Sequence, residues 1–151
     1  MVVIDSDVLL LAFAFQNDSR QEINQKFLEF VQTAQPATTI YNVMEVLGQL
    51  SFNLSAERLD QWQSWLVDAY QLTVIWMADA EKEMEKESFR DELFDRPYQK
   101  MRDQRMSFMD ALVLSLAERA PDVECFVTWN AKHFKGKTTL TVLTPEEYLA
   151  R

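Results

Sequence analysis

The sequence has almost no glycine: Gly48 and Gly136 are the only two among 151 residues. Phosphate-binding loops need several closely spaced glycines, because their backbone turns tightly and approaches the phosphate. Neither the G-x-G-x-x-G nor the G-x-x-x-x-G-K-[ST] pattern can be written with these two glycines. The G-x-S-x-G nucleophile elbow is excluded for the same reason. The scarcity of glycine therefore removes the usual nucleotide-cofactor loops and one large class of serine hydrolases.

Cysteine and histidine each occur once. The single Cys125 permits neither a disulfide framework nor a thiolate cluster for zinc, so a reducing, cytoplasmic setting is the simplest expectation. The single His133 excludes a histidine-rich zinc site and any mechanism that needs two imidazoles. The reactive group that remains in quantity is the carboxylate, since 24 Asp and Glu oppose 15 Lys and Arg and give a formal net charge of −9.

Long apolar runs are also missing. The longest uncharged apolar run, residues 8–15, is too short to cross a bilayer, and the N-terminus carries Asp5 and Asp7 where a signal peptide needs basic residues. We therefore expect a soluble protein with no cleaved leader and no membrane partner. The net negative charge argues against a protein that mainly coats nucleic acid. An acidic metal site would itself account for part of that charge.

The pattern of the chain predicts a single α/β domain over residues 1–151. Its length suits one core, and a hydrophobic content of 48% provides ample apolar surface to bury. Strand-like segments separated by helical ones indicate a sandwich around a mostly parallel sheet. We expect strands at residues 1–5, 72–76, 125–129 and 140–144, with a short strand or connection at 37–39. We expect helices at residues 8–15, 21–34, 40–50, 55–69, 107–120 and 145–150, and a charged helical stretch at 80–105 that breaks near Pro97.

Two acids follow the first predicted strand. Ligands gather at the carboxyl ends of parallel strands, which is where Asp5 and Asp7 must lie. Asp5 either binds a metal or caps the next helix, and the local sequence leaves these two interpretations equal. Asp7 stands directly before the apolar helix and is the better candidate for its cap, so we assign it a supporting role.

Two further acids lie on later helices. Glu45 shares a helical face with Asn42, although an ordinary exposed glutamate would show the same spacing. Asp110 completes an S-x-x-D capping pattern that begins at Ser107. Its helix is apolar on nearly every side, so we expect the start of that helix to be buried and its acid to need a counter-charge.

Thr128 and Asn130 end the strand expected at 125–129, although turn formation alone would explain Asn130. Acids and polar side chains thus lie in order along the elements that border one crevice. Three clustered carboxylates, Asp5, Glu45 and Asp110, would repel one another, which raises their proton affinity or recruits a hard cation. Mg²⁺ or Mn²⁺ suits a site of oxygen ligands.

The sequence resembles the PIN-domain family, metal-dependent nucleases that include VapC-type toxins. The matching segments, in order, are VVIDSDVLL, TTIYNVMEVLGQL, FMDALVLSLA, VTWNAKHF and VLTPEEYL. The resemblance implies a three-layer α/β/α sandwich with a parallel, about five-stranded sheet, and a metal held by Asp5, Glu45 and Asp110. Many family members carry a fourth acid where this chain has Asn130, and an amide cannot supply the charge for a tightly bound second cation. Asp7 stands where a neutral residue is common, and it could return that charge from another side.

The acids and the resemblance together predict an endoribonuclease that hydrolyses phosphodiester bonds in single-stranded RNA with Mg²⁺ or Mn²⁺. Basic side chains after the fourth strand are candidate substrate contacts, although a solvated turn would explain them equally well: Lys132, His133, Lys135 and Lys137. A toxin of this kind would be expected to have a cognate antitoxin protein, and homodimers are common in the family.

Two other functions fit parts of the sequence. The D-S-D-V segment after the first strand matches the start of a haloacid-dehalogenase-type phosphatase, with Asp5 as nucleophile, but the lysine and the later acidic loop of that class are not convincingly present. The second alternative is a PIN-like protein- or RNA-binding module with impaired chemistry. Asn130 and the net negative charge favour this module modestly.

Overall fold

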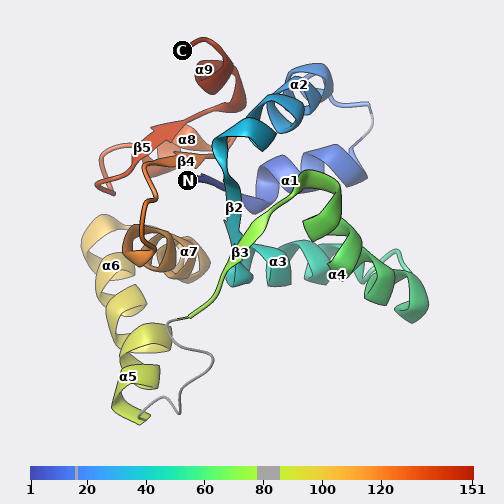
Figure 1. The fold of residues 1–151 in the computed structure, drawn as a ribbon. Helices are drawn as coiled ribbons and strands as arrows, with labels where there is room; N and C mark the ends of the chain where they lie inside the picture. Colours follow the sequence, from blue (N-terminus) through green and yellow to red (C-terminus); the bar gives the residue numbers. More distant parts are fainter. Residues whose placement is uncertain (16, 78–85) are drawn as a thin grey trace.

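The computed structural model describes residues 1–15, 17–77 and 86–151, which form a parallel sheet with helices on both sides (Figure 1). The sheet has five strands in the order β3-β2-β1-β4-β5, and every pair of neighbours is parallel. The strands are β1 Val2–Ile4, β2 Pro36–Thr39, β3 Thr73–Ile75, β4 Cys125–Val127 and β5 Thr141–Leu143. The predicted α/β sandwich is confirmed, and the uncertain segment at 37–39 is a strand.

The helices connect the strands and cover the sheet. Their bounds are α1 Ser6–Ala14, α2 Gln21–Val31, α3 Ile40–Leu50, α4 Ala56–Tyr70, α5 Lys86–Arg90, α6 Arg96–Gln104, α7 Phe108–Arg119, α8 Ala131–Phe134 and α9 Pro145–Leu149, with a 3-10 turn η1 Gln32–Ala34 and a π-helical turn η2 Asp91–Asp95. Figure 1 shows α1 and α2 on one side of the sheet and α6 and α7 on the other. Within the described ranges, no helix is long and apolar enough to cross a membrane.

The central strand β1 places the acids that the sequence singles out. All three of its residues are buried, as expected for a strand with a neighbour on each side and a helix on each face. Val2 pairs with Pro36 on β2 and Ile4 pairs with Val127 on β4. The chain leaves β1 toward β2 and later returns to β4, so the order of strands reverses beside β1. The carboxyl end of β1 is therefore the switch point where an open α/β sheet forms its crevice.

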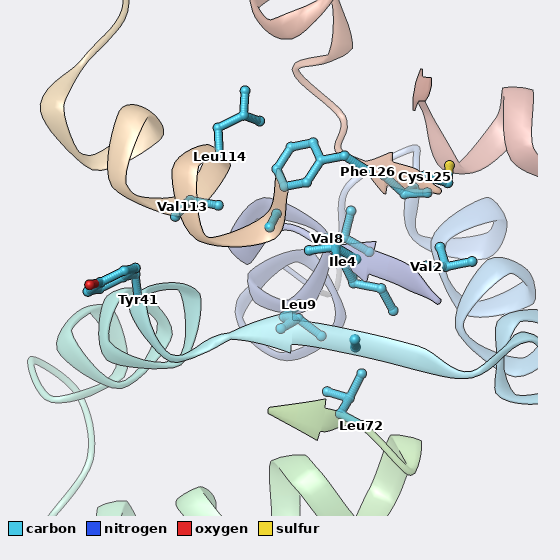
Figure 2. Packing of buried hydrophobic residues seen from close by; sticks show 14 of the residues in the cluster. Val2, Ile4, Val8, Leu9, Tyr41, Leu72, Val113, Leu114, Cys125 and Phe126 are labelled. Atoms are coloured by element: carbon cyan, nitrogen blue, oxygen red, sulfur yellow. The ribbon is translucent and has the colours of Figure 1, made fainter. Parts of the chain in front are cut away.

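One continuous apolar core holds the layers together. Figure 2 shows Ile4 of β1, Val8 of α1, Leu114 of α7 and Phe126 of β4 among the buried side chains of this core. The helix α7 is buried along most of its length, which agrees with its nearly uniform apolar sequence. Because β1, α1 and α7 meet in the core, the polar groups at their ends are held on a rigid frame.

The charged stretch differs from the prediction in its detail. The chain stays helical from residue 86 to 104, and the predicted break near Pro97 is instead the π-helical turn η2 that precedes it. Proline has no N–H to donate and its ring crowds the carbonyl four residues earlier, and a widened turn accommodates both. Residues 80–85 of the predicted stretch lie outside the described residues.

The helix predicted at 21–34 ends earlier than expected. Its α-helical part stops at Val31, the 3-10 turn η1 follows, and Gln35 adopts a left-handed conformation with φ 52°. Gln35 reverses the chain so that Pro36 can begin β2. Proline has no backbone N–H to donate, and the first residue of this strand does not need one. Pro36 therefore begins the strand, while the turn at Gln35 ends the helical segment.

Candidate functional site

Asp5 follows β1 directly and is buried, with 8% of its surface exposed. Its backbone is extended and its carboxylate accepts a hydrogen bond from the Ser6 backbone N–H at 2.8 Å, which makes Asp5 the N-cap of α1. The prediction that Asp7 caps this helix is wrong, because α1 begins at Ser6, immediately after the strand, and Asp7 already lies in its first turn. Asp5 thus caps α1, which is one of the two roles that the sequence left open at this position. Metal binding by Asp5 stays a prediction.

The helix α3 brings Asn42 and Glu45 to Asp5. Thr39 ends β2 and forms a capping box with Asn42, whose side-chain amide donates to Asp5 Oδ1 at 2.8 Å. The Ser6 hydroxyl donates to Glu45 Oε2 at 2.7 Å and lies 3.4 Å from Asp5 Oδ1. Ser6 therefore bridges two of the three predicted acids. Ser6 stands between the two aspartates of the D-S-D segment. A small hydroxyl side chain at that position was the only sequence feature that could have identified it as part of the site.

Asp7 joins the first helix to the end of β4. Its carboxylate accepts hydrogen bonds from the Thr128 hydroxyl at 3.0 Å, the Trp129 N–H at 3.2 Å and the Asn130 N–H at 3.1 Å. Three predicted supporting residues, Asp7, Thr128 and Asn130, are thus brought together. Asn130 takes part through its backbone, and the residue is exposed.

Asp110 lies at the start of α7, where its backbone N–H donates to the capping Ser107 hydroxyl at 3.0 Å. Its carboxylate Oδ2 lies 3.1 Å from Nε2 of His133. The His133 backbone N–H donates to the Asn130 carbonyl at 2.9 Å, and Asn130 in turn contacts Asp7. This series of contacts places Asp110 on the same edge of the sheet as Asp5. The structure sets His133 beside a predicted metal ligand, in addition to the substrate contact that the sequence suggested.

The predicted lysine contacts lie beyond this network. Lys135 forms an ion pair with Glu147 of α9 at 2.7 Å, and Lys137 donates to the Arg105 carbonyl at the end of α6 at 3.2 Å. Lys132 is exposed on α8. A role for these lysines in substrate binding stays a prediction.

Burial and mutual repulsion shift the proton affinity of the aspartates. Burial, then the charge of Asp7 and, more weakly, that of Glu45 raise the pKa of Asp5 to about 7, against the lowering effect of hydrogen bonds. The pKa of Asp7 is also raised, mainly by burial, while its bonds to Trp129, Thr128 and Asn130 oppose the shift. The acidic site thus contains negative charge that the surrounding protein only partly compensates.

A hard divalent cation fits the chemistry of these donors. Carboxylate oxygens are its preferred ligands, and its charge would offset the repulsion that raises the pKa of Asp5. Throughout residues 1–15, 17–77 and 86–151, however, no three Asp, Glu, His or Cys side chains lie close enough together to hold a metal ion. Asp5 and Glu45 share the Ser6 hydroxyl, whereas the carboxylate of Asp110 is beside His133. The fit therefore rests on the kind of donors and on the Asp5–Glu45 pair.

A second group of residues at this edge was not predicted from the sequence. The Trp129 indole N–H donates to Asn24 Oδ1 at 2.7 Å, and the guanidinium of Arg20 lies over the Trp129 ring at 5.5 Å from its centroid. Asn24 falls on the apolar stripe of its helix and could have been noticed as a polar residue in a buried position. No sequence pattern links it to Trp129, which is 105 residues away.

The fold and the site define an α/β protein with an acidic site at the switch point of a parallel sheet. No family model and no curated protein matches the sequence. Several solved chains have a similar fold, among them the following two. A chain of VapBC2 from Rickettsia felis, bound to a DNA fragment from their promoter, is 18% identical with a TM-score of 0.64, and the match covers 95% of this chain and 98% of that one. A chain of a toxin-antitoxin complex from Klebsiella pneumoniae is 18% identical with a TM-score of 0.60, covering 96% and 98%. These likenesses confirm the predicted PIN-like fold.

Proposed function

We propose that this protein is a metal-dependent endoribonuclease that hydrolyses phosphodiester bonds in single-stranded RNA, with Mg²⁺ or Mn²⁺ as its cation. The observation that carries the proposal is the buried Asp5 at the end of β1, linked to Glu45 through Ser6 and to α3 through Asn42. An acid of this kind, at the switch point of a PIN-like sheet, is costly to bury unless a cation compensates it.

Each residue of the network has a proposed role. Asp5 and Glu45 would hold the cation, and Asp110, whose carboxylate lies beside His133, is the predicted third ligand. When bound, the cation would polarise a phosphate and lower the pKa of a water from ~16 to ~7–9. The Ser6 hydroxyl orients the Glu45 carboxylate, and the Asn42 amide orients that of Asp5. Such partners of the ligands restrict their rotation and prepare the site before substrate arrives. Asp7 holds the segment after β4 against α1, which keeps Thr128 near the crevice.

The test of this proposal is cleavage of a labelled single-stranded RNA pool with Mg²⁺ or Mn²⁺. We expect Asp5→Asn, Glu45→Gln and Asp110→Asn each to lower the rate by more than about 100-fold, the upper end of what losing a ligand's supporting partner costs. Asp60→Asn, which changes an exposed acid on α4, is the matched control and should leave the rate unchanged. Full activity in Asp5→Asn and Asp110→Asn would refute the mechanism, and full activity in Asp110→Asn alone would remove that residue from the ligand set.

We further propose that the protein belongs to a toxin–antitoxin pair. One structure of similar fold is described as a toxin-antitoxin complex, and another as VapBC2 bound to a DNA fragment from their promoter. The chain also carries an aromatic surface suited to a protein partner, where Phe13, Trp62, Trp65 and Tyr70 form edge-to-face and tilted contacts. Trp65 is 47% exposed, and it borders a hollow of about 400 Å³ on α4. Exposed aromatic patches of this kind commonly mark interfaces.

The partner is tested by expressing the chain together with the product of the neighbouring reading frame. A stable complex should form and should block RNA cleavage, and Trp65→Ala should weaken it. Trp76→Ala, which changes another exposed tryptophan after β3, is the matched control. Cleavage that the neighbouring product does not affect would argue against the pair. A homodimer and a cytoplasmic location remain predictions.

A binding module with impaired chemistry is the second candidate. Two observations favour it: Asn130 stands where many of the PIN-domain proteins that the sequence resembles carry an acid, and the Asp110 carboxylate lies beside His133 and not with the other acids. Calorimetric titration with Mn²⁺ separates the two functions. An enzyme should give saturable heat that Asp5→Asn abolishes, whereas an impaired module should give none.

A further inference from the structure

An arginine stacked on a tryptophan lies beside the acidic crevice. We propose that Arg20, supported by Trp129, binds a phosphate of the RNA strand next to the bond that is cut. This inference rests on the proposed ribonuclease function and adds a substrate-binding residue to it.

Trp129 is held rigidly at two points. Its backbone N–H donates to Asp7 Oδ1 at 3.2 Å, and its indole N–H donates to Asn24 Oδ1 at 2.7 Å. Asn24 is completely buried, and its own amide donates to the Val8 carbonyl at 3.0 Å. Burying an amide is costly unless its hydrogen bonds are made. Here the Asn24 amide bonds both to the Val8 carbonyl and to the indole, which fixes the plane of Trp129 against the same helix that carries Asp7.

Arg20 rests on the face of this fixed ring. Its guanidinium carbon lies 5.5 Å from the centroid of the indole, which is a cation–π distance. Nε and Nη2 donate to the two carboxylate oxygens of Asp18 at 2.9 and 2.7 Å. These bonds hold the guanidinium without covering it, since 49% of the side chain is exposed. Its Nη1 group makes no hydrogen bond to the residues that the structure describes.

The position of Arg20 points to the substrate of the acidic site. Arg20 lies over Trp129, whose backbone N–H donates to Asp7, so the guanidinium is close to the acidic site. Asp18 and, more weakly, the charge of Asp7 raise the pKa of Arg20. A planar guanidinium matches phosphate oxygens, and arginine stacked on an aromatic ring is a common contact to single-stranded nucleic acid. Several clustered carboxylates repel a polyanion such as RNA, so a positively charged side chain at the edge of the site is needed to attract it. Lys135 and Arg20 are both ion-paired, but Arg20 also rests on the ring of Trp129, whose backbone N–H donates to Asp7 of the acidic site.

A purely structural role for Arg20 is the competing explanation. The ion pair with Asp18 could simply stabilise the turn before α2. The two roles differ in what they change: a structural arginine affects the stability of the fold, whereas a phosphate contact affects RNA affinity and its dependence on salt.

The experiment measures the binding of a fluorescent single-stranded RNA by anisotropy, over a series of KCl concentrations. The Asp5→Asn variant serves as the parent so that the RNA is not cleaved. Adding Arg20→Ala should raise Kd about tenfold, as expected for one lost charge-assisted contact. It should also lower the slope of log K against log salt by about 0.7, the value for one phosphate of a single strand. Arg90→Ala is the matched control, because Arg90 is another exposed arginine paired with a nearby aspartate, Asp95, on a distant helix.

Two further variants keep the test decisive. Arg20→Lys retains the positive charge but loses the planar guanidinium with its paired N–H donors. Its salt slope should match that of the parent, while its RNA affinity should lie between those of the parent and Arg20→Ala. Trp129→Phe keeps a ring beneath Arg20 but loses the bond to Asn24, and it should weaken RNA binding without unfolding the protein, as checked by its Tm. In the cleaving enzyme, Arg20→Ala should raise KM and leave kcat within about twofold.

The outcomes separate this inference from the proposed function. If the parent binds RNA and the wild type cleaves it, an unchanged Kd and salt slope in Arg20→Ala would overturn the role of Arg20 alone. If the wild type neither binds nor cleaves RNA, the proposed function fails, and the inference fails with it.

Discussion

Asp5 illustrates how the environment of one side chain can set its chemistry. It caps α1, accepts the Asn42 amide and lies among the charges of Asp7 and Glu45, all while buried. The hydrogen bonds favour its charged form, but burial and repulsion outweigh them, and the pKa of Asp5 is about 7. Near neutral pH the residue is thus poised between a neutral acid and an anion that a cation could bind.

This balance predicts a dependence of stability on pH in metal-free buffer. The folded protein binds the proton of Asp5 more tightly than the unfolded chain does, since the pKa is raised from 3.8 to about 7. The free energy of unfolding should therefore be highest at low pH within this window and fall as the pH rises toward 7. Asp5→Asn removes the titration and keeps one acceptor oxygen. Above pH 7, the Tm of Asp5→Asn should exceed that of the wild type by about 3 °C or more. This difference in Tm should narrow as the pH falls toward 4.

Thermal unfolding followed by circular dichroism in EDTA checks this prediction. Asp60→Asn, at an exposed position, should show a constant difference from the wild type across the same range. A gap between Asp5→Asn and the wild type that widens as the pH falls would contradict the expected direction of the pH dependence.

Asn130 allows a prediction about metal affinity. It lies three residues after β4 and its backbone N–H donates to Asp7, at the position where the resemblance to PIN-domain proteins implies an acid. Asn130→Asp adds a carboxylate to the crevice, so the variant should bind Mn²⁺ about tenfold more tightly in calorimetric titration, or take up a second ion. Asn53→Asp, which adds the same charge at an exposed position after α3, should leave the affinity unchanged.

Among the elements, the connection between β2 and α3 matters most for the site. Thr39 ends the strand, caps the helix and donates its hydroxyl to Asn42 Oδ1 at 2.7 Å, while the Asn42 amide reaches Asp5. The neighbouring Thr38 hydroxyl donates to the Ile4 carbonyl at 2.9 Å and fastens β2 to the end of β1. The same turn that starts the helix therefore also positions a partner of the buried acid.

A second capping box in the chain provides a matched comparison. Thr144 caps α9 through Glu147 in the same way as Thr39 caps α3, but α9 has no contact to Asp5. Thr39→Val should lower the free energy of unfolding by about 2 kcal/mol, because it removes a cap and leaves a buried amide oxygen with fewer partners. Thr144→Val should cost about 1 kcal/mol.

Urea unfolding measures both losses, and Mn²⁺ titration separates the two variants. The affinity for Mn²⁺ should fall several-fold in Thr39→Val and stay unchanged in Thr144→Val. Equal effects of the two variants on Mn²⁺ binding would show that the cap of α3 does not organise the site.

The molecule as a whole depends on its central strand. β1 pairs with β2 on one side and β4 on the other, and α3 packs against both α1 and α7. Neither the half before β3 nor the half after it has an apolar core of its own, since residues from both halves share one cluster. The two halves of the described structure are therefore interdependent.

This interdependence predicts that the chain unfolds as one unit. In urea, the loss of helical circular dichroism and the change in tryptophan fluorescence should follow the same transition. The tryptophans report on separate regions, since Trp62 and Trp65 lie on α4, Trp76 after β3 and Trp129 after β4. Two separated transitions would show that the predicted single domain is instead two units.

The sequence by itself determined the class of fold and the candidate acids. Alternation of short apolar strands with amphipathic helices depends on contacts within a few residues, and it correctly predicted most of the elements and the mostly parallel sheet, but not the short helix α8. Asp5 at a strand end and Asp110 at a helix start could be recognised because hydrophobic neighbours mark the positions where buried elements end. The PIN-like fold was likewise accessible from its ordered motifs.

Only the tertiary structure decided how these side chains meet. The choice of Asp5 over Asp7 as the cap depended on a one-residue turn between β1 and α1. The bridge from Ser6 to Glu45, the contact of His133 with Asp110 and the bond from Trp129 to Asn24 join residues 39, 23 and 105 positions apart. Such contacts follow from the packing of helices on a twisted sheet, where a rotation of one helix by one residue would direct different side chains into the crevice. Local sequence patterns do not encode that rotation, because it is set by the whole core.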